Sequence, residues 1–357
     1  MKLHQDSNAF QVLLEQIHNR TGYRTDVLEK DYYVVLILKE LAEKQQAGLP
    51  AFFKGGTALY KALKTTNRFS EDIDLSVDTR ECSRTQNDRR LERAAKKYAS
   101  LNRDVEAGRT NRSEVISVYT YEPITAFDKS DALQRFGKLK VEATSFTISE
   151  PVDRLEVSTM IYDFATEDEQ RILRDMYDVF PFSVLTITME RIFIDKLFAA
   201  EAYVRRSSEP NRAFEAAKHI YDLAVMLNQP KIQRLLSDEA QVKSLLDIRM
   251  EEEVDRLDGI PGVSPTEFTF FNSAAYDSYV KKAYSTMQLQ YVLRQEDRIE
   301  YDQAMTALNV IHDRLMQNRA WEQYKPSIKL MLRAKRIGSE RTDDRTPKQQ
   351  ILSEPER

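Results

Sequence analysis

The chain has 357 residues, 41% hydrophobic and 31% charged, so it carries enough apolar material for a substantial core and is long enough for two domains. Its net charge of -4 excludes a global positive field, and any nucleic-acid binding must therefore depend on local patches. The single cysteine, Cys82, excludes an internal disulfide framework. Because no apolar run approaches the roughly 20 residues that span a bilayer and no signal peptide is evident, we expect a cytoplasmic protein without a membrane partner.

The first elements expected along the chain are typical of a domain that mixes helices and strands. Residues 26–43 place apolar side chains at helical spacing, with Asp26 as the expected cap. Residues 51–53 indicate a short strand, followed by a glycine turn and a helix that starts near Thr57. Residues 72–77 alternate as a strand does, and the charged residues 83–101 predict an exposed helix.

The remaining elements complete a sheet and then become helical. Residues 114–122, 138–147 and 154–161 show β-branched or aromatic alternation, which predicts one half-buried sheet ending near residue 165. From Thr188 onward the pattern is helical. We therefore expect an α+β fold, with a small mixed-sheet domain at residues 1–165, an α-helical domain at 166–338 and a disordered tail at 339–357.

Two basic runs, residues 84–97 and 328–345, stand out against the acidic average. Either run could contact a polyanion, and the alternative is an ordinary solvated helix face. Neither contains a base-recognition motif.

Two of only nine glycines, Gly55 and Gly56, follow the apolar strand of residues 51–53 after a single lysine. A glycine pair lets the backbone approach a ligand closely, and free amide groups at a helix start can hold phosphate oxygens. Thr57 adds a hydroxyl at the same turn. A simple tight turn is the alternative, so the phosphate hypothesis needs support from elsewhere.

That support comes from Asp72 and Asp74 in the stretch EDIDLSV. Residues two apart on a strand point to the same face, which puts the two carboxylates about 7 Å apart. Unit charges about 4 Å apart interact by about 4 kcal/mol at an effective dielectric of about 20, so such a pair favours a bound cation. Magnesium prefers carboxylates together with substrate phosphates. A wet edge strand is the alternative, but the buried face expected from Ile73, Leu75 and Val77 favours a built site.

A two-metal centre needs a further carboxylate, usually from a neighbouring strand. Glu142 is the favoured candidate because it lies in the middle of a predicted strand, where an unpaired buried acid would be costly. Glu122 and Glu156, which also lie in or beside predicted strands, are the alternatives.

The combination of a GG turn, a short helix, a DxD strand and a later carboxylate resembles the polymerase-beta-type nucleotidyltransferase superfamily. More narrowly, the segments EKDYYVVLILKEL, FFKGGTALYKAL, RFSEDIDLSV and MERIFIDKLFAA…HIYDLAVM are similar to the AbiEii/AbiGii toxin family of toxin–antitoxin and phage-defence systems. These segments lie between residue 28 and about residue 227. GGTAL together with RFSEDIDL is specific, whereas each piece alone is not.

The resemblance implies two further active-site positions, Lys196 and Asp222. Lys196 also falls inside an apolar helical stripe, where an interior lysine needs a partner such as a triphosphate or else snorkels along the stripe. Asp222 shares a polar helix face with Lys218 and His219, where a surface ion pair would also explain it. Many relatives carry an arginine before paired acids at this position, and this chain has His219 and one acid instead.

The resemblance implies a magnesium-dependent nucleotidyltransferase that acts as a toxin. Asp72, Asp74 and Glu142 would hold two magnesium ions, and the turn from Gly55 to Thr57 would hold the pyrophosphate of a nucleoside triphosphate. Ser70 and Lys196 would neutralise that pyrophosphate, with Arg68 as a second charge. The implied acceptor is RNA, specifically the 3′ end of tRNA, and the implied partner is a cognate antitoxin. The alternatives are a small-molecule nucleotidyltransferase and a non-catalytic nucleotide-binding module.

Overall fold

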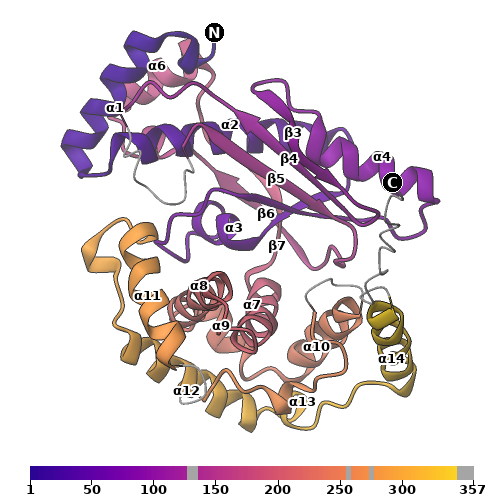
Figure 1. The fold of residues 1–357 in the computed structure, drawn as a ribbon. Coiled ribbons are helices and arrows are strands. Elements are labelled where there is room, and N and C mark those ends of the chain that lie inside the picture. Colours follow the sequence, from indigo (N-terminus) through magenta and orange to yellow (C-terminus); the bar gives the residue numbers. More distant parts are fainter. Residues whose placement is uncertain (127–135, 255–258, 273–276, 344–357) are drawn as a thin grey trace, which may run out of the picture.

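Seven strands form one mixed sheet, and the sheet separates two layers of helices in the computed structural model of the protein (Figure 1). The structure describes residues 1–126, 136–254, 259–272 and 277–343. The strand order is β3-β4-β5-β2-β1-β7-β6. The strands are β1 (Ala51–Lys54), β2 (Ile73–Val77), β3 (Asn102–Thr110), β4 (Glu114–Thr120), β5 (Lys138–Thr144), β6 (Val152–Val157) and β7 (Phe182–Ile187).

The central strand β2 has the alternation that its sequence predicts. Ile73, Leu75 and Val77 have no exposed surface, whereas Asp74 on the other face is only half-buried. β2 pairs in parallel with β5, which puts Asp74 opposite Glu142, and pairs antiparallel with β1, which puts Lys54 opposite Asp74. The α+β fold class is therefore confirmed, and its sheet gathers charged side chains on one face.

The first helical layer covers the apolar face of the sheet. It consists of α1 (Ser7–Thr21), α2 (Thr25–Gln46) and α4 (Arg84–Lys96), and the short helix α3 (Gly55–Lys61) connects β1 to β2. α4 buries Leu91, Ala94 and Ala95. The predicted helix at residues 26–43 is confirmed as α2, but the predicted Asp26 cap is wrong. Arg24 occupies the cap position without a side-chain bond, and its guanidinium donates to the Asp26 carboxylate.

The second helical layer faces the other side of the sheet (Figure 1). Two helices, α5 (Met160–Asp163) and α6 (Glu167–Tyr177), lie between β6 and β7 in the sequence. The helices of the second layer follow β7: α7 (Met189–Val204), α8 (Pro210–Met226), α9 (Pro230–Leu235), α10 (Glu239–Glu253), α11 (Asp277–Tyr291), α12 (Tyr301–Gln317), α13 (Arg319–Glu322) and α14 (Ile328–Asp343). α14 extends five residues into the segment predicted as a disordered tail. The rest of that segment, 344–357, lies outside the described residues.

The prediction that the sheet ends near residue 165 is wrong. β7 lies beyond that boundary and pairs in parallel with β1, with Phe53 opposite Thr186. It also pairs antiparallel with β6, so the sheet reaches into the predicted helical domain. β3 is a second strand that the pattern does not indicate, because it is an exposed edge strand of mostly polar residues and therefore lacks an apolar alternation.

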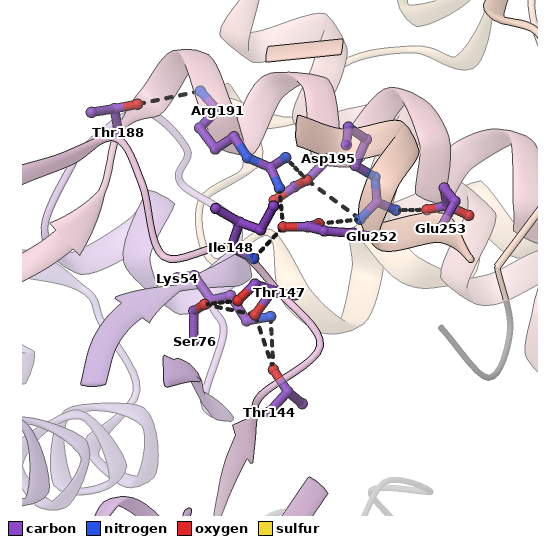
Figure 2. Close-up of polar contacts among 11 residues, drawn as sticks. Lys54, Ser76, Thr144, Thr147, Ile148, Thr188, Arg191, Asp195, Glu252 and Glu253 are labelled. Atoms are coloured by element: carbon purple, nitrogen blue, oxygen red, sulfur yellow. Dashed lines mark hydrogen bonds and ion pairs between the residues drawn. The ribbon is translucent and has the colours of Figure 1, made fainter. Parts of the chain in front are cut away.

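A buried ion-pair network joins the sheet to the second helical layer (Figure 2). The backbone N–H of Ile148, in the segment after β5, donates to the Glu252 carboxylate of α10 over 2.6 Å. Glu252 also pairs with Arg191 of α7 and with Arg249 over 3.1 Å. Arg191, Arg249 and Glu252 are each at most 1% exposed, so this junction is held by charges that water does not screen.

Within the described ranges, no helix combines the length and the apolar composition that crossing a membrane requires.

Candidate active site

Three carboxylates, those of Asp72, Asp74 and Glu142, gather on the face of the sheet that looks toward the second helical layer. We call them the carboxylate cluster. Asp74 on β2 lies directly opposite Glu142 on β5, and Asp72 immediately precedes β2. Burial raises the pKa of the Asp74 carboxyl to about 7, and the negative charges of Glu142 and Asp72 add to this rise. The cluster therefore carries more negative charge than its own surroundings neutralise.

Lys140 partly offsets that charge, and its role is not indicated by the sequence pattern. Its Nζ lies 2.9 Å from Oδ2 of Asp72 and 3.6 Å from Oε2 of Glu142. Burial acts to lower the pKa of Lys140, but the three carboxylates, Asp72 first, raise it above the ordinary lysine value. The lysine ammonium thus occupies the position of a cation between two carboxylates.

The donor set fits a hard divalent cation. Carboxylate oxygens are the ligands that magnesium prefers, and the pKa of Asp74 is raised by burial and by the charges of Glu142 and Asp72, which a bound cation would offset. In the described part of the chain, no three Asp, Glu, His or Cys side chains stand in an arrangement that could hold a metal ion as they lie. The ammonium of Lys140 stands between Asp72 and Glu142. A metal ion would have to displace it.

The two alternatives to Glu142 lie elsewhere. Glu156 is exposed on β6, which is separated from β2 by β1 and β7. Glu122 is exposed beyond the end of β4. Of the three candidates, only Glu142 is placed beside Asp74.

The glycine pair allows the turn before α3 to touch this cluster. Gly55 has a φ of +79°, and a Cβ at this position would lie 2.2 Å from Oδ2 of Asp74. A Cβ on Gly56 would lie 2.9 Å from both Nη2 of Arg68 and Oγ of Ser70. Neither contact leaves room for a side chain, so the backbone itself lines the site here.

The hydroxyl of Thr57 is engaged within the protein. Thr57 is fully buried, and its Oγ1 donates to Ser70 Oγ over 2.9 Å and contacts the backbone oxygen of Asp72. These contacts tie the start of α3 to the loop that leads into β2. Thr57 therefore fixes the position of Ser70 and Asp72 rather than presenting a free hydroxyl.

Arg68, Lys196 and Asp222 form a second charged group, which we call the buried triad. Arg68 donates from Nε and Nη2 to the two oxygens of Asp222 over 2.9 and 2.8 Å, and Lys196 Nζ lies 2.6 Å from Asp222 Oδ2. Burial acts to raise the pKa of Asp222, but Arg68 and Lys196 together lower it well below its usual range. Asp222 has no exposed surface, so the surface-pair explanation of this residue is wrong.

The triad connects the sheet to the second helical layer, because Arg68 lies in the loop before β2 whereas Lys196 and Asp222 lie on α7 and α8. Lys196 thus has a carboxylate of the same protein as its partner. His219 lies beside it, with Nδ1 3.5 Å from Lys196 Nζ and its ring stacked on Tyr203 at 5.4 Å. Burial, followed by the Lys196 charge, lowers the pKa of His219 well below its usual value. The imidazole is therefore neutral at pH 7.

Asp74 and Glu142 of the carboxylate cluster and Lys196 of the triad line one cavity of about 190 Å³ between the sheet and the second helical layer. The cavity is lined by residues of the sheet and its adjoining turns and by residues of α7 and α8: Lys54, Gly55, Asp74, Glu142, Thr144, Phe146, Ile192, Asp195, Lys196, Ala199 and His219. Of the predicted site residues, Gly55, Asp74, Glu142 and Lys196 reach this cavity.

Sequence reasoning missed two lysines of this site, although each carries a detectable signal. Lys140 precedes Glu142 by two residues on a strand and therefore shares its face. Lys54 ends β1 immediately before the glycine turn, opposite Asp74, and its Nζ donates to Thr144 Oγ1 over 3.2 Å (Figure 2). Both signals depend on knowing how the strands pair, which the sequence alone leaves open.

Comparison with known proteins identifies one matching family. The profile described as nucleotidyl transferase AbiEii toxin, type IV toxin–antitoxin system, matches residues 36–310. No curated protein matches the chain in sequence.

Two solved structures are similar at low identity. JHP933 from Helicobacter pylori is 16% identical with a TM-score of 0.40, over 90% of this chain and 97% of that one. MenT4, the nucleotidyltransferase toxin Rv2826c from Mycobacterium tuberculosis H37Rv, is 14% identical with a TM-score of 0.42, over 85% of this chain and 98% of that one.

Proposed function

The chain belongs to the AbiEii nucleotidyl transferase toxin family and is therefore a transferase, and from that premise we propose that it transfers a nucleoside monophosphate from a nucleoside triphosphate to RNA with the help of magnesium. The proposed acceptor is the 3′ end of tRNA, whose modification would stop translation. A cognate antitoxin is the expected partner of a toxin of this type.

The observation that carries the proposal is the charge imbalance of the carboxylate cluster. Asp74 and Glu142 lie side by side on paired strands, and burial, followed by the charges of Glu142 and Asp72, raises the pKa of Asp74 although Lys140 and Lys54 act to lower it. A site with this imbalance, beside a glycine turn that leaves the backbone exposed, is suited to a cation and a phosphate chain together.

We propose Asp72, Asp74 and Glu142 as the ligands of two magnesium ions. When bound, magnesium supplies positive charge that stabilises the entering and leaving oxygens of the transferred phosphoryl group. Lys140 holds Asp72 and Glu142 in place in the absence of metal, through its contacts of 2.9 and 3.6 Å. It would then be released toward the incoming phosphates, where its positive charge remains useful. Glu142 is also the proposed acceptor of the proton that leaves the attacking hydroxyl.

The triphosphate tail is proposed to lie along the turn formed by Gly55, Gly56 and Thr57. The Ser70 hydroxyl lies beside Gly56, and Lys196 reaches the cavity from α7, so both can contact phosphate oxygens. Arg68 and Asp222 have each other as partners over 2.8 Å. We therefore propose that Arg68 and Asp222 act as positioning residues, which hold Lys196 and the turn, and not as direct phosphate ligands.

The test is label transfer from each of the four α-phosphate-labelled nucleoside triphosphates into total bacterial tRNA. The native protein is compared with Asp72→Ala and with Asp175→Asn, a change to an exposed carboxylate on α6 that serves as control. We expect label to enter tRNA with the native protein and the control, to require magnesium, and to be lost with Asp72→Ala.

The absence of labelled RNA with every nucleotide would overturn the RNA acceptor. Pyrophosphate release in those same reactions would then indicate an acceptor other than RNA, and its absence would indicate a site that only binds the nucleotide. Transfer that persists in EDTA would overturn the magnesium dependence.

A further inference from the structure

A second, larger hollow adjoins the catalytic cavity. It measures about 530 Å³ and is lined by Thr79, Cys82, Arg84, Asn87, Arg112, Ser113, Ser145 and Phe146. Phe146 also lines the catalytic cavity, so one half-buried aromatic ring separates the two spaces. A ligand that lies in the larger hollow therefore reaches the carboxylate cluster by passing this ring.

The size of the two spaces indicates that the acceptor extends outside the catalytic cavity. Sites for small ligands usually measure about 300–1,000 Å³, and the catalytic cavity of about 190 Å³ falls below this range. It cannot enclose both a nucleoside triphosphate and a bulky acceptor. The neighbouring hollow of about 530 Å³ falls within the range and offers the additional space.

The charge of the larger hollow indicates an anionic ligand. Its lining includes two arginines and no acidic residue. Arg84 begins α4 and Arg112 lies in the turn between β3 and β4, and both are exposed. Within the described residues neither guanidinium forms an ion pair, whereas nearby Arg80 is paired with Asp78 over 2.9 Å. Two guanidinium groups without an ion pair, one at the start of a helix and one in the turn between β3 and β4, are suited to two phosphate groups.

A third hollow, which also includes Phe146, shows that this charge is not a general property of the region. It is lined by Arg80 and Arg333, but also by the three carboxylates of Asp78, Glu251 and Glu252. Asp78 and Glu252 are paired with arginines, so the third hollow offers a polyanion little positive charge, whereas the side of Arg84 and Arg112 attracts it.

We propose that this basic groove, defined by Arg84, Arg112 and Phe146, binds the single-stranded end of the RNA acceptor and directs its terminal hydroxyl to the carboxylate cluster. The arginines contact phosphates, and Phe146 stacks on a base close to the terminus. An acidic protein could match the two arginines, but it would not require an aromatic ring at the entrance to the catalytic cavity. The proposal rests on the proposed function, because it takes RNA as the acceptor.

The test is fluorescence anisotropy of the full chain with a labelled single-stranded RNA of about 12 nucleotides, in EDTA and without triphosphate. Four proteins are compared: the native protein, Arg84→Ala/Arg112→Ala, Phe146→Leu and the control Arg171→Ala. Arg171 is an exposed arginine of α6, remote from the groove. The binding constant is measured over a series of salt concentrations.

We expect the double arginine variant to bind this RNA at least about tenfold more weakly. The slope of log K against log salt should also fall in magnitude by about 1.4, because each phosphate contact on a single strand contributes about 0.7. Phe146→Leu should weaken binding about tenfold without changing the slope, since stacking releases no counterions. Arg171→Ala should bind as the native protein does.

Native affinity and an unchanged salt slope in the double arginine variant would overturn the groove, as would a native protein that fails to bind the single strand. If the double arginine variant lost binding to an acidic protein partner but still bound the RNA normally, the RNA proposal would be overturned in favour of a protein-binding site. Failure of the proposed function differs from both results, because the native protein would then bind the RNA and transfer no label to it.

Discussion

The carboxylate cluster and the buried triad contain the same kind of residue in opposite electrostatic states. In the cluster, burial and the charges of Glu142 and Asp72 raise the pKa of Asp74 to about 7, although Lys140 and Lys54 act to lower it. In the triad, Asp222 has two cations within 2.8 Å, and its pKa is well below its usual range. Burial acts to raise the pKa of both carboxylates, and Asp222 is the more deeply buried, so the opposite outcomes come from the charges around them: Arg68 and Lys196 outweigh burial at Asp222, whereas Lys140 and Lys54 do not outweigh it at Asp74.

The largest expected effect separates activity from stability. Asp74→Asn should reduce nucleotide transfer about a thousandfold, because a metal ligand supplies several kcal/mol of transition-state stabilisation and each 1.36 kcal/mol is a factor of ten in rate. The same change should leave the metal-free protein at least as stable, since it removes one of three like charges. Label transfer and urea unfolding in EDTA measure the two effects. A variant that is both inactive and strongly destabilised would contradict the proposed role of the cluster.

The triad should respond in the opposite manner. Asp222→Ala leaves Arg68 and Lys196 buried without their carboxylate, and breaking a buried pair in this way costs about 3–5 kcal/mol of the free energy of unfolding. Urea unfolding in EDTA measures the change. The control is Asp302→Ala, which removes an exposed pair with Lys281 and should change stability by less than about 1 kcal/mol. Equal effects of the two substitutions would show that the triad is not a structural junction.

Lys140→Met should sharpen the comparison by removing the cation that partly balances the cluster. Without an ammonium between Asp72 and Glu142, magnesium should bind the nucleotide-free protein about tenfold more tightly, which corresponds to about 1.4 kcal/mol. Isothermal titration with magnesium chloride measures this affinity. Lys138→Met, two residues earlier on the same strand and exposed, is the matched control. Unchanged or weaker magnesium binding in Lys140→Met would contradict the competition between lysine and metal.

The smallest effect expected is a difference in pH dependence. Because the pKa of Asp74 is higher in the folded protein than the ordinary aspartate value of 3.8, the folded state holds an extra proton between about pH 4 and 7. The stability that this proton contributes is therefore lost as the pH rises through 7. Asp74→Asn should consequently gain stability relative to the native protein between pH 5 and 8. The pKa of Asp222 is lowered, so its contribution is lost only below about pH 4.

Urea unfolding in EDTA at pH 5 to 8 checks this difference. The free-energy difference between Asp222→Ala and the native protein should stay constant over the same range. A constant difference for Asp74→Asn would show that Asp74 is already ionised at pH 5.

Much of the carboxylate cluster could be predicted because its information is local. The alternation in EDIDLSV identifies both the buried face of β2 and the two acids opposite, and a glycine pair 17 residues before Asp72 (72 − 55) indicates the turn. Glu142 could be chosen from its place in the middle of a strand. Glu71, the neighbouring acid in the same stretch, has a structural role instead, because it pairs with buried Lys30 of α2 over 3.2 Å.

The triad could be predicted only in part, because its charges come from distant parts of the chain. Arg68 and Asp222 are separated by 154 residues, and no periodicity relates them. The sequence and its family resemblance therefore indicated Arg68 as a phosphate contact and Asp222 as an active-site residue, with a surface ion pair as the alternative for Asp222, whereas the structure pairs the two residues with each other. β7 was missed for a related reason, since a strand that follows a helix is recognised as part of the sheet only through its pairing with β1.

The close approach of Gly55 to Asp74 also limits how this protein can change. Even alanine at position 55 would place a methyl carbon on the carboxylate oxygen and would have to adopt a backbone conformation that L-residues rarely take. Substitutions that adjust the acidic strand and substitutions that adjust the turn are consequently not independent. Laboratory evolution of nucleotide preference would have to leave this pair intact and find its variation among the residues on α7 and α8 that line the opposite wall.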